Sequence, residues 1–455
     1  MHNHFHEFIL QSRSKSFDKV HRNIINYNID KYDNAVGKGL SRLSNLDSVK
    51  KKVHSIKWRA IENLDKYLIE FESNLIRNGG KVIWANNAAE ANQAIIKIAK
   101  QHQVSSVVKS KSMITEEIEL NNTFKENNIN VLETDLGEFI VQLLGQKPYH
   151  IVTPAMHLSR QNIADLFHRQ FGTAINATPQ ELTLKARELL RHQFVDAGIG
   201  ITGANFLIAD TGSVAITENE GNARLVTTFP KIHITIAGIE KIIPSMADLD
   251  IFWPLLSTHG TGQNLTVYNT LLTGPKQYDE NDGPTEMYVI LLDNGRTQLL
   301  KQKEQRQALY CIRCGACLNA CPVYRNIGGH TYATTYSGPI GSVISPHLKG
   351  MKDFKHLSQA STLCGKCTEV CPVKIDLHKM LLLNRRDAAQ YGNNSWLETV
   401  GWFFWKKGML SRKVMDMLSP RVKRNIFQIF FKSIFKEREL PLFGTKSYSA
   451  SKNSN

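Results

Sequence analysis

Hydrophobic residues recur every three or four positions from about residue 56 to residue 77, which predicts an amphipathic helix. The apolar positions are Ile61, Leu64, Leu68, Phe71 and Leu75, and Gly79-Gly80 follows as a stop signal. The preceding stretch, residues 1 to about 50, is polar. We expect its three alternating histidines to form a frayed, solvated start, with metal binding as the alternative. They are His2, His4 and His6.

After residue 80 the pattern changes to short apolar runs that alternate with helical segments. The runs predicted as strands are KVIWA, SSVVKS, INVLETD and YHIVTP. Helical periodicity between them covers residues 88–103, 116–128 and 158–171. This alternation favours a parallel sheet covered by helices.

A capped helix and further strands follow. Thr178-Pro179-Gln180-Glu181 places an N-cap threonine, a first-turn proline and a capping-box glutamate ahead of LTLKARELLRHQF. The apolar runs FLIAD, SVAITE, RLVTTFP, KIHITIAG and MYVILLDNG predict strands. In KIHITIAG the isoleucines alternate with polar residues, as in a half-buried strand. The whole predicts an α/β domain over about residues 80 to 300.

Three glycine-containing segments in this domain invite functional readings. Gly198, Gly200 and Gly203 spell G-x-G-x-x-G, but a helix enters the motif and a strand leaves it, so we expect a helix-to-strand loop and no dinucleotide site. ENEGNAR, residues 218–224, predicts a polar hairpin, with a small-anion pocket using Arg224 as the alternative. THGTGQ, residues 258–263, is either a loop or an anion-binding backbone segment.

Length and composition narrow the class of protein. A chain of 455 residues has room for about three domains. The chain has an odd number of cysteines, seven, and they are confined to two short segments. Because no secretory leader opens the sequence either, we expect a reducing cytoplasm and no disulfides. Every apolar stretch is interrupted before the roughly 18 residues that a membrane-spanning helix requires.

The cysteine spacing carries the most specific chemical signal. Residues 311–321 read C-x2-C-x2-C-x3-C before a proline, which is typical of ferredoxin-type iron–sulfur ligation. Three thiolates of such a run hold one cluster, and the cysteine before the proline ligates the other cluster in two-cluster proteins. The spacing therefore predicts one cluster on Cys311, Cys314, Cys317 and Cys371, and a second on Cys321, Cys364 and Cys367.

The second cysteine segment is one thiolate short, because Ser361 stands where the first segment has Cys311. The second cluster is then [3Fe–4S], or [4Fe–4S] with a non-cysteine ligand such as the Ser361 oxygen, water, substrate or a partner residue. Zinc also binds C-x2-C pairs, but seven cysteines do not fill two closed four-thiolate sites. Two clusters would form a one-electron relay. The sequence contains no convincing flavin site, catalytic triad or P-loop, so we expect other subunits to share the organic oxidation.

The C-terminal segment is basic and aromatic. The net charge of the chain is +15, and residues 401–455 hold twelve Lys or Arg against three Asp or Glu, which is +9. An amphipathic helix that packs on its own domain or on a sister subunit is expected, with peripheral contact to an anionic membrane as the alternative. Nucleic acid is not expected, because no reader motif accompanies the charge.

Three segments together resemble the iron–sulfur subunit family of the bacterial L-lactate utilisation system. They are CIRCGACLNACPVYRNIGGHTY, LCGKCTEVCPVKIDLHKMLL and GITGANFLIADTGSVAITENEGNARLVTTFPKIHITIAGIEKI. The resemblance implies a LUD domain of the NagB/RpiA/CoA-transferase-like α/β class, then an all-α helical ferredoxin domain. It also implies two [4Fe–4S] clusters on the seven cysteines, with no cysteine at the position of Ser361.

The resemblance implies an organisation and a function as well. The expected parts are an N-terminal helical segment at 1–79, the LUD domain at 80–300, the ferredoxin domain at 301–395 and a basic extension at 396–455. The implied function is electron transfer in a cytoplasmic complex that oxidises L-lactate to pyruvate, with a cysteine-rich subunit and a second LUD-domain protein as partners. Such a subunit is a non-autonomous oxidoreductase. The alternatives are a redox-responsive or lactate-responsive regulatory protein, and a self-sufficient enzyme.

Overall fold

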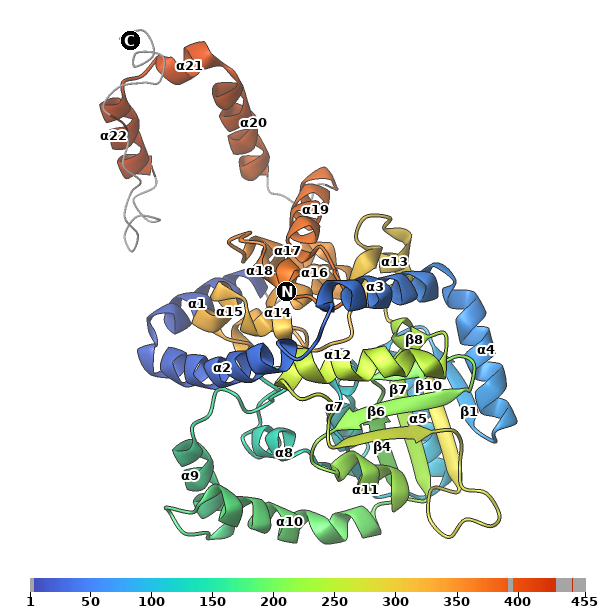
Figure 1. Cartoon of the computed structure of the whole chain (residues 1–455). Helices are drawn as coiled ribbons and strands as arrows, with labels where there is room; N and C mark the ends of the chain where they lie inside the picture. The colour runs from blue at the N-terminus through green and yellow to red at the C-terminus, as the bar shows by residue number, and fades with distance from the viewer. Residues whose placement is uncertain (1–3, 392–395, 431–443, 445–455) are drawn as a thin grey trace. The chain divides into compact units, whose positions relative to one another are not determined.

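The computed structural model describes residues 4–391, 396–430 and 444. It divides into two compact units, Met1–Arg386 and Asp387–Asn455. The first unit contains both β-sheets and all seven cysteines, and the described part of the second contains helices (Figure 1).

Four helices open the first unit: α1 (His4–Phe17), α2 (Lys19–Leu40), α3 (Leu46–Glu62) and α4 (Leu64–Arg77). The helix predicted over 56–77 is therefore two helices, because the backbone turns at Asn63. The expected frayed start is wrong for the described residues: α1 buries Phe8, and the His4 ring stacks on Phe354 with centroids 4.7 Å apart. His2 lies outside the described residues.

A six-stranded parallel sheet forms the centre of the unit, in the order β1-β10-β7-β4-β2-β3. Its strands are β1 (Lys81–Ala85), β2 (Ser106–Lys109), β3 (Asn130–Glu133), β4 (Ile199–Gly203), β7 (Ile232–Gly238) and β10 (Glu286–Leu292). The predicted parallel sheet is confirmed. Within KIHITIAG, all seven residues of β7 are buried and the strand is not half-buried as predicted, because β7 lies at the centre of the sheet with both faces covered.

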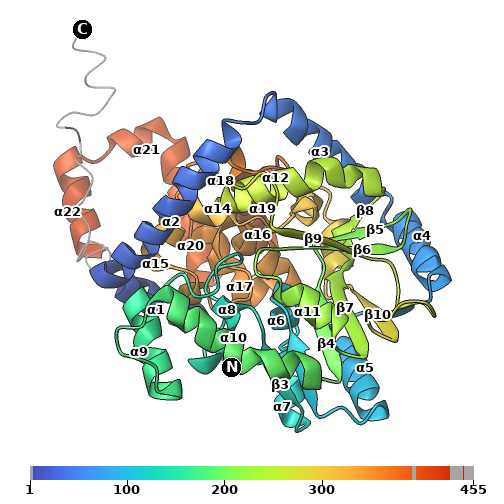
Figure 2. The same ribbon diagram turned by 60° about the horizontal axis from the view of Figure 1, so that its bottom comes forward.

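Helices cover both faces of this sheet, and successive side chains point to opposite faces. On one face Val107 joins a core with α5 (Ala88–Gln101) and α7 (Leu120–Glu126). On the other face Val108 joins a core with α8 (Leu136–Leu143), α9 (Arg160–Phe171), α10 (Pro179–Asp196) and α11 (Asn222–Thr228), and Figure 2 shows α10 and α11 beside the strands. The predicted cap of α10 is confirmed: the Glu181 N–H donates to Thr178 Oγ1 at 3.3 Å.

Some predicted elements are wrong. YHIVTP is a loop, and RLVTTFP is mostly helix α11. The G-x-G-x-x-G segment is not a loop but contains strand β4, where a Cβ on Gly200 would lie 2.0 Å from the Val226 carbonyl oxygen of α11. THGTGQ begins inside helix α12 (Leu249–Thr261). The glycines of β4 therefore permit close helix packing, and no helix leaves the motif to receive a pyrophosphate.

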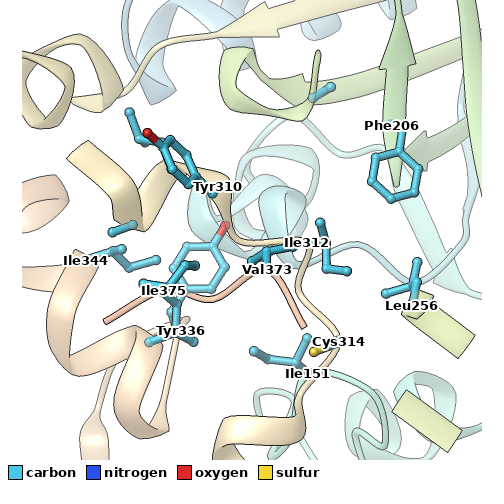
Figure 3. Packing of buried hydrophobic residues seen from close by; sticks show 14 of the residues in the cluster. Ile151, Phe206, Leu256, Tyr310, Ile312, Cys314, Tyr336, Ile344, Val373 and Ile375 are labelled. Carbon is cyan, nitrogen blue, oxygen red and sulfur yellow. The ribbon is translucent and has the colours of Figure 1, made fainter. Parts of the chain in front are cut away.

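A second sheet of four strands joins the parallel sheet to the cysteine region. Its order is β8-β5-β6-β9, with β5 (Phe206–Ile208), β6 (Ser213–Glu218), β8 (Ile242–Ile243) and β9 (Tyr268–Leu272). Its buried residues belong to a large core that continues into both cysteine segments. Figure 3 shows Phe206 and Leu256 of this core with Ile312, Cys314 and Val373.

Every described element from residue 296 to residue 390 is helical. These are α13 (Arg296–Lys301), η3 (Arg306–Tyr310), α14 (Ala316–Asn319), α15 (Pro322–Ile327), η4 (His330–Tyr332), α16 (Gly338–Lys349), α17 (Met351–Gln359), α18 (Lys366–Glu369) and α19 (Leu377–Gln390). The segment GGHTY enters η4, and the segment SGPIG enters α16.

The second unit contains α20 (Trp396–Leu410), α21 (Arg412–Asp416) and α22 (Pro420–Phe430). The aromatic side chains of Trp402, Phe403 and Phe404 are exposed there. Within the described ranges, no helix combines the length and the apolar character needed to cross a bilayer. Residues 431–443 and 445–455 of the predicted basic extension lie outside the described residues.

A buried ion-pair network connects the parallel sheet to the cysteine region. The Arg296 guanidinium donates to both carboxylate oxygens of Glu117 at 2.9 Å and to Glu240 Oε2 at 2.5 Å. Tyr336, from the cysteine region, donates to Glu117 Oε2 at 2.6 Å. Burial alone would raise the pKa of Glu240, but the Arg296 and Arg313 guanidiniums hold it at about 2. The Glu240 carboxylate is thus charged and paired with Arg296 at neutral pH, and burial raises the pKa of Tyr336, so its neutral phenol donates to Glu117.

Replacing Arg296 with methionine leaves the carboxylates of Glu117 and Glu240 buried without their main partner. We expect a loss of about 3–5 kcal/mol of unfolding free energy. A thermal unfolding scan at neutral pH would measure it as a midpoint lowered by several degrees. The exposed residue Arg77 provides the control, since Arg77→Met should leave the midpoint nearly unchanged.

The pH dependence gives a second check on the same variant. Because the pKa of Glu240 is depressed from 4.5 to about 2, its contribution is present above pH 4.5 and is lost as the pH falls toward 2. The difference between wild type and Arg296→Met should therefore shrink over that window. A difference that stays constant down to pH 2 would contradict the assignment.

Candidate iron–sulfur site

The two cysteine segments have the same backbone conformation. Arg313 and Leu363 both adopt left-handed geometry, with φ of 61° and 56°, and so do Gly315 and Gly365, with φ of 79° and 78°. Each glycine precedes a four-residue helix, α14 or α18. Left-handed geometry costs a non-glycine residue about 1–2 kcal/mol, so its repetition marks a loop shape that is maintained against strain.

Within this repeat, Ser361 occupies the position of Cys311. The Arg313 N–H donates to Cys311 Sγ at 3.4 Å, and the Leu363 N–H donates to Ser361 Oγ at 3.1 Å. The correspondence seen in the sequence is therefore also a correspondence of side-chain hydrogen bonding. A hydroxyl stands in the second loop where the first loop has a thiol.

The structure brings the cysteines into two groups. The thiols of Cys314 and Cys317 each interact electrostatically with Cys311 and with Cys371. The Cys367 thiol interacts with Cys321 and Cys364, and the Cys321 thiol with Cys364. Each group thus includes one cysteine from the other segment.

The sulfur atoms face backbone amides that can stabilise negative charge. The Ile375 N–H donates to Cys371 Sγ at 3.3 Å. Burial raises the pKa of Cys371 to about 12 and that of Cys367 to about 11, while backbone amides oppose the rise. Exposed Cys364 differs, because the Lys366 N–H lowers the pKa of its thiol. The buried thiols would be protonated without a cation, so metal binding would displace their protons.

Cationic side chains surround the first group. The Cys311 sulfur interacts electrostatically with Lys57, Lys241 and Arg313. Burial lowers the pKa of Lys57 to about 7 and that of Lys241 to about 8, and the Glu240 carboxylate works against this lowering. The Lys57 ammonium donates to the Glu240 carbonyl at 2.6 Å.

The donor set is compatible with two inorganic clusters. In the described part of the chain, which includes His4 and His6, no three histidine, cysteine or acidic side chains meet closely enough to hold one metal ion. Thiolates around a cluster bind different iron atoms and need not converge on one point. Two grouped sets of thiols with amide donors to sulfur are the surroundings that such clusters use.

A cavity of about 470 Å³ lies at the carboxyl ends of β2, β4 and β7 and reaches Cys314. Gly260 and Thr261 of THGTGQ line it, as do Glu218, Glu220 and Asn222 of ENEGNAR. The predicted hairpin at ENEGNAR is wrong, because Glu218 instead accepts the Ala223 and Arg224 N–H groups at the start of α11. Arg224 is not among the residues that line this cavity, and its guanidinium carbon lies 5.4 Å from the Tyr268 ring centre.

Three functional candidates were missed by sequence reasoning: Lys241, Arg313 and Ser112, which all line the cavity. They come from three separate segments, and no spacing rule links them. Arg313 alone lies within a recognised motif, since it stands between two cysteines of the first segment.

Comparisons with known proteins agree with this arrangement. The LUD domain family matches residues 68–292, and the 4Fe-4S dicluster domain family matches residues 307–375. A solved structure, a DUF162 family protein from Deinococcus radiodurans, has 14% sequence identity, covers 50% of this chain and 98% of its own, and has a TM-score of only 0.30. The class of protein is therefore a LUD-domain protein that carries a 4Fe-4S dicluster domain.

Relatives narrow the class further. Lactate utilization protein B of Geobacillus thermodenitrificans (strain NG80-2) is 46% identical over 348 residues, which are 76% of this chain and 73% of the relative. Lactate utilization protein B of Geobacillus sp. (strain WCH70) is 48% identical over 332 residues, or 73% and 70% of the two chains. The chain belongs to the lactate utilization protein B family.

The exchange of one cysteine between segments can be tested by EPR with iron and sulfide analysis on anaerobically purified protein. We expect Cys371→Ser to give the spectrum of Cys314→Ser, because both remove a ligand of the first group. Cys321→Ser should match Cys367→Ser for the second group. If Cys371→Ser instead matches Cys367→Ser, each segment holds its own cluster and the exchange is wrong.

Proposed function

We propose that the protein is the iron–sulfur electron-transfer subunit of a multi-protein complex that oxidises L-lactate to pyruvate. The observation that carries the proposal is the pair of repeated cysteine loops, whose thiols form two groups with one cysteine of each group coming from the other segment. When bound, two clusters accept and donate single electrons. The choice of lactate as the substrate rests on the name of the relatives, lactate utilization protein B.

Exposure of the two groups differs in a way that suits a relay. Cys314, Cys317 and Cys371 of the first group are buried, while Cys364 of the second group is exposed. The first group adjoins the cavity, and the second reaches the surface, where a partner could receive electrons. We propose a cysteine-rich subunit and a second LUD-domain protein as the partners. In this proposal, residues 80–300 form the LUD domain and residues 301–395 form an all-α ferredoxin domain.

The exposed aromatic side chains of α20 and the basic charge of residues 401–455 support a further part of the proposal. This segment would contact a sister subunit or the inner face of an anionic membrane. Either contact is consistent with a cytoplasmic subunit. The charge and the aromatic residues suit either surface.

A regulatory function is the second candidate. The cavity beside Cys314 favours it, because a ligand bound there could alter the first group without turnover. A ligand-responsive protein needs such a cavity but does not need partners that accept electrons.

Gene deletion separates the two functions. We expect cells without this gene to lose oxidation of L-lactate, because the clusters would be required on the path of every electron. The wild-type gene should restore oxidation, and Cys314→Ser should not. Normal lactate oxidation in the deletion strain, together with changed transcription of lactate genes, would identify a regulator instead.

Replacing Ser361 with cysteine tests whether position 361 faces the iron site of the second cluster that lacks a cysteine ligand. If the native second cluster is [3Fe–4S], the iron content should rise from about seven to about eight per chain. If it is [4Fe–4S], iron should stay at about eight while the EPR signal of the second cluster alone changes. Exposed Gln359 provides the control, since Gln359→Cys adds a thiol nearby without occupying the repeated position. Identical spectra for Ser361→Cys and wild type would show that position 361 does not face the cluster.

A further inference from the structure

The cavity beside the first cysteine loop has the position of a ligand site. It lies at the carboxyl ends of the parallel strands, where open α/β sheets bind their ligands. Ser112 follows β2, Ala204 follows β4 and Lys241 follows β7. The opposite wall comes from the cysteine region, through Arg313 and Cys314.

Two buried hydrogen-bond donors of the wall have no partner: Arg313 Nη1 and Ser112 Oγ. Half-buried Lys241 lines the same cavity and adds a cationic side chain to it. Ser112 is only 5% exposed. Arg313 is held in place by Tyr336, whose ring centre lies 4.3 Å from the guanidinium carbon, and by a long 3.5 Å contact with Glu240. Buried donors that lack partners are costly, which indicates that a ligand completes them.

The acidic groups of the wall, in contrast, already have partners. Glu240 accepts from Arg296, and Glu218 caps the start of α11. Glu220 accepts the Leu136 N–H at 3.0 Å, and Asp135 accepts the Glu138 N–H at 3.1 Å. The groups left to bind a ligand are therefore cationic or neutral donors, which select an anion.

We propose that this cavity binds a short-chain 2-hydroxy or 2-oxo carboxylate, with its carboxylate at Lys241 and Arg313. Apolar side chains such as Ile151, Ile216 and Leu256 share the wall and suit the alkyl part of such an acid better than they suit inorganic phosphate. The site deepens the proposed function and rests on it for the substrate class. Its contact with Cys314 brings the bound acid next to the first cysteine group.

Isothermal titration calorimetry on the full, anaerobically purified chain with its clusters tests the site directly. The probes are L-lactate, pyruvate and inorganic phosphate. We expect at least one of the two acids to bind at millimolar concentration or below, and Lys241→Met to weaken that binding about tenfold or more. Ser112→Ala should weaken it less, because a neutral donor contributes less than a charged one.

Controls keep the result interpretable. Lys97 is exposed on α5, so Lys97→Met should bind the acids as the wild type does. The visible absorbance of the clusters reports whether Lys241→Met is correctly folded; if it is not, Lys241→Gln takes its place. No binding of either acid by the wild type, phosphate binding as tight as that of the acids, or equal binding by Lys241→Met and wild type would each overturn the proposal.

The outcome is separable from that of the proposed function. Binding by the wild type combined with normal lactate oxidation in the deletion strain would reject the electron-transfer function and leave the site. Absence of binding combined with lost lactate oxidation would reject the site and leave the function.

Discussion

The buried contacts of Arg296 are the constraint on which the arrangement of this protein depends. One guanidinium satisfies Glu117 and Glu240, which belong to different segments of the α/β region, and Tyr336 of the cysteine region completes the set. Even the backbone is adapted to it, because a Cβ on Gly238 would lie 2.0 Å from Glu240 Oε2 and 2.4 Å from Arg296 Nε. Buried charges stabilise an arrangement only when all of them are paired, so the network fixes one orientation of the cysteine region against the sheet.

The two cysteine groups share a loop shape but have different electrostatic surroundings. The first group faces Lys57, Lys241 and Arg313 inside the protein, while exposed Cys364 of the second is next to Lys366 and solvent. Buried cations favour the addition of negative charge more strongly than a solvated lysine does. We therefore expect the first site to hold an electron more tightly than its loop alone would allow.

Local signals in the sequence predicted much of the fold. The capping box at Thr178 and the apolar runs of β7 and β10 depend only on residues close together in the sequence. The helix and the two strands predicted from them are therefore present in the structure. The apolar run RLVTTFP predicted a strand, but most of it belongs to helix α11, whose first amides donate to the Glu218 carboxylate. The spacing of the cysteines predicted their grouping, which the structure parallels but does not test with metal. The cavity could not be predicted, because Ser112, Lys241 and Arg313 meet only through the packing of the two regions.

The grouping of Cys371 with residues near 311 has a consequence for biogenesis. A ribosome must synthesise the chain past residue 371 before the first set of thiols is complete, although three of its members emerge much earlier. Under the proposed ligation, insertion of the first cluster would have to follow the synthesis of residue 371, and a chain that stops before it would expose an incomplete ligand set to oxidation. Because the proposed second cluster would take both Cys321 and Cys364, binding it would close the 42 residues between them into a loop.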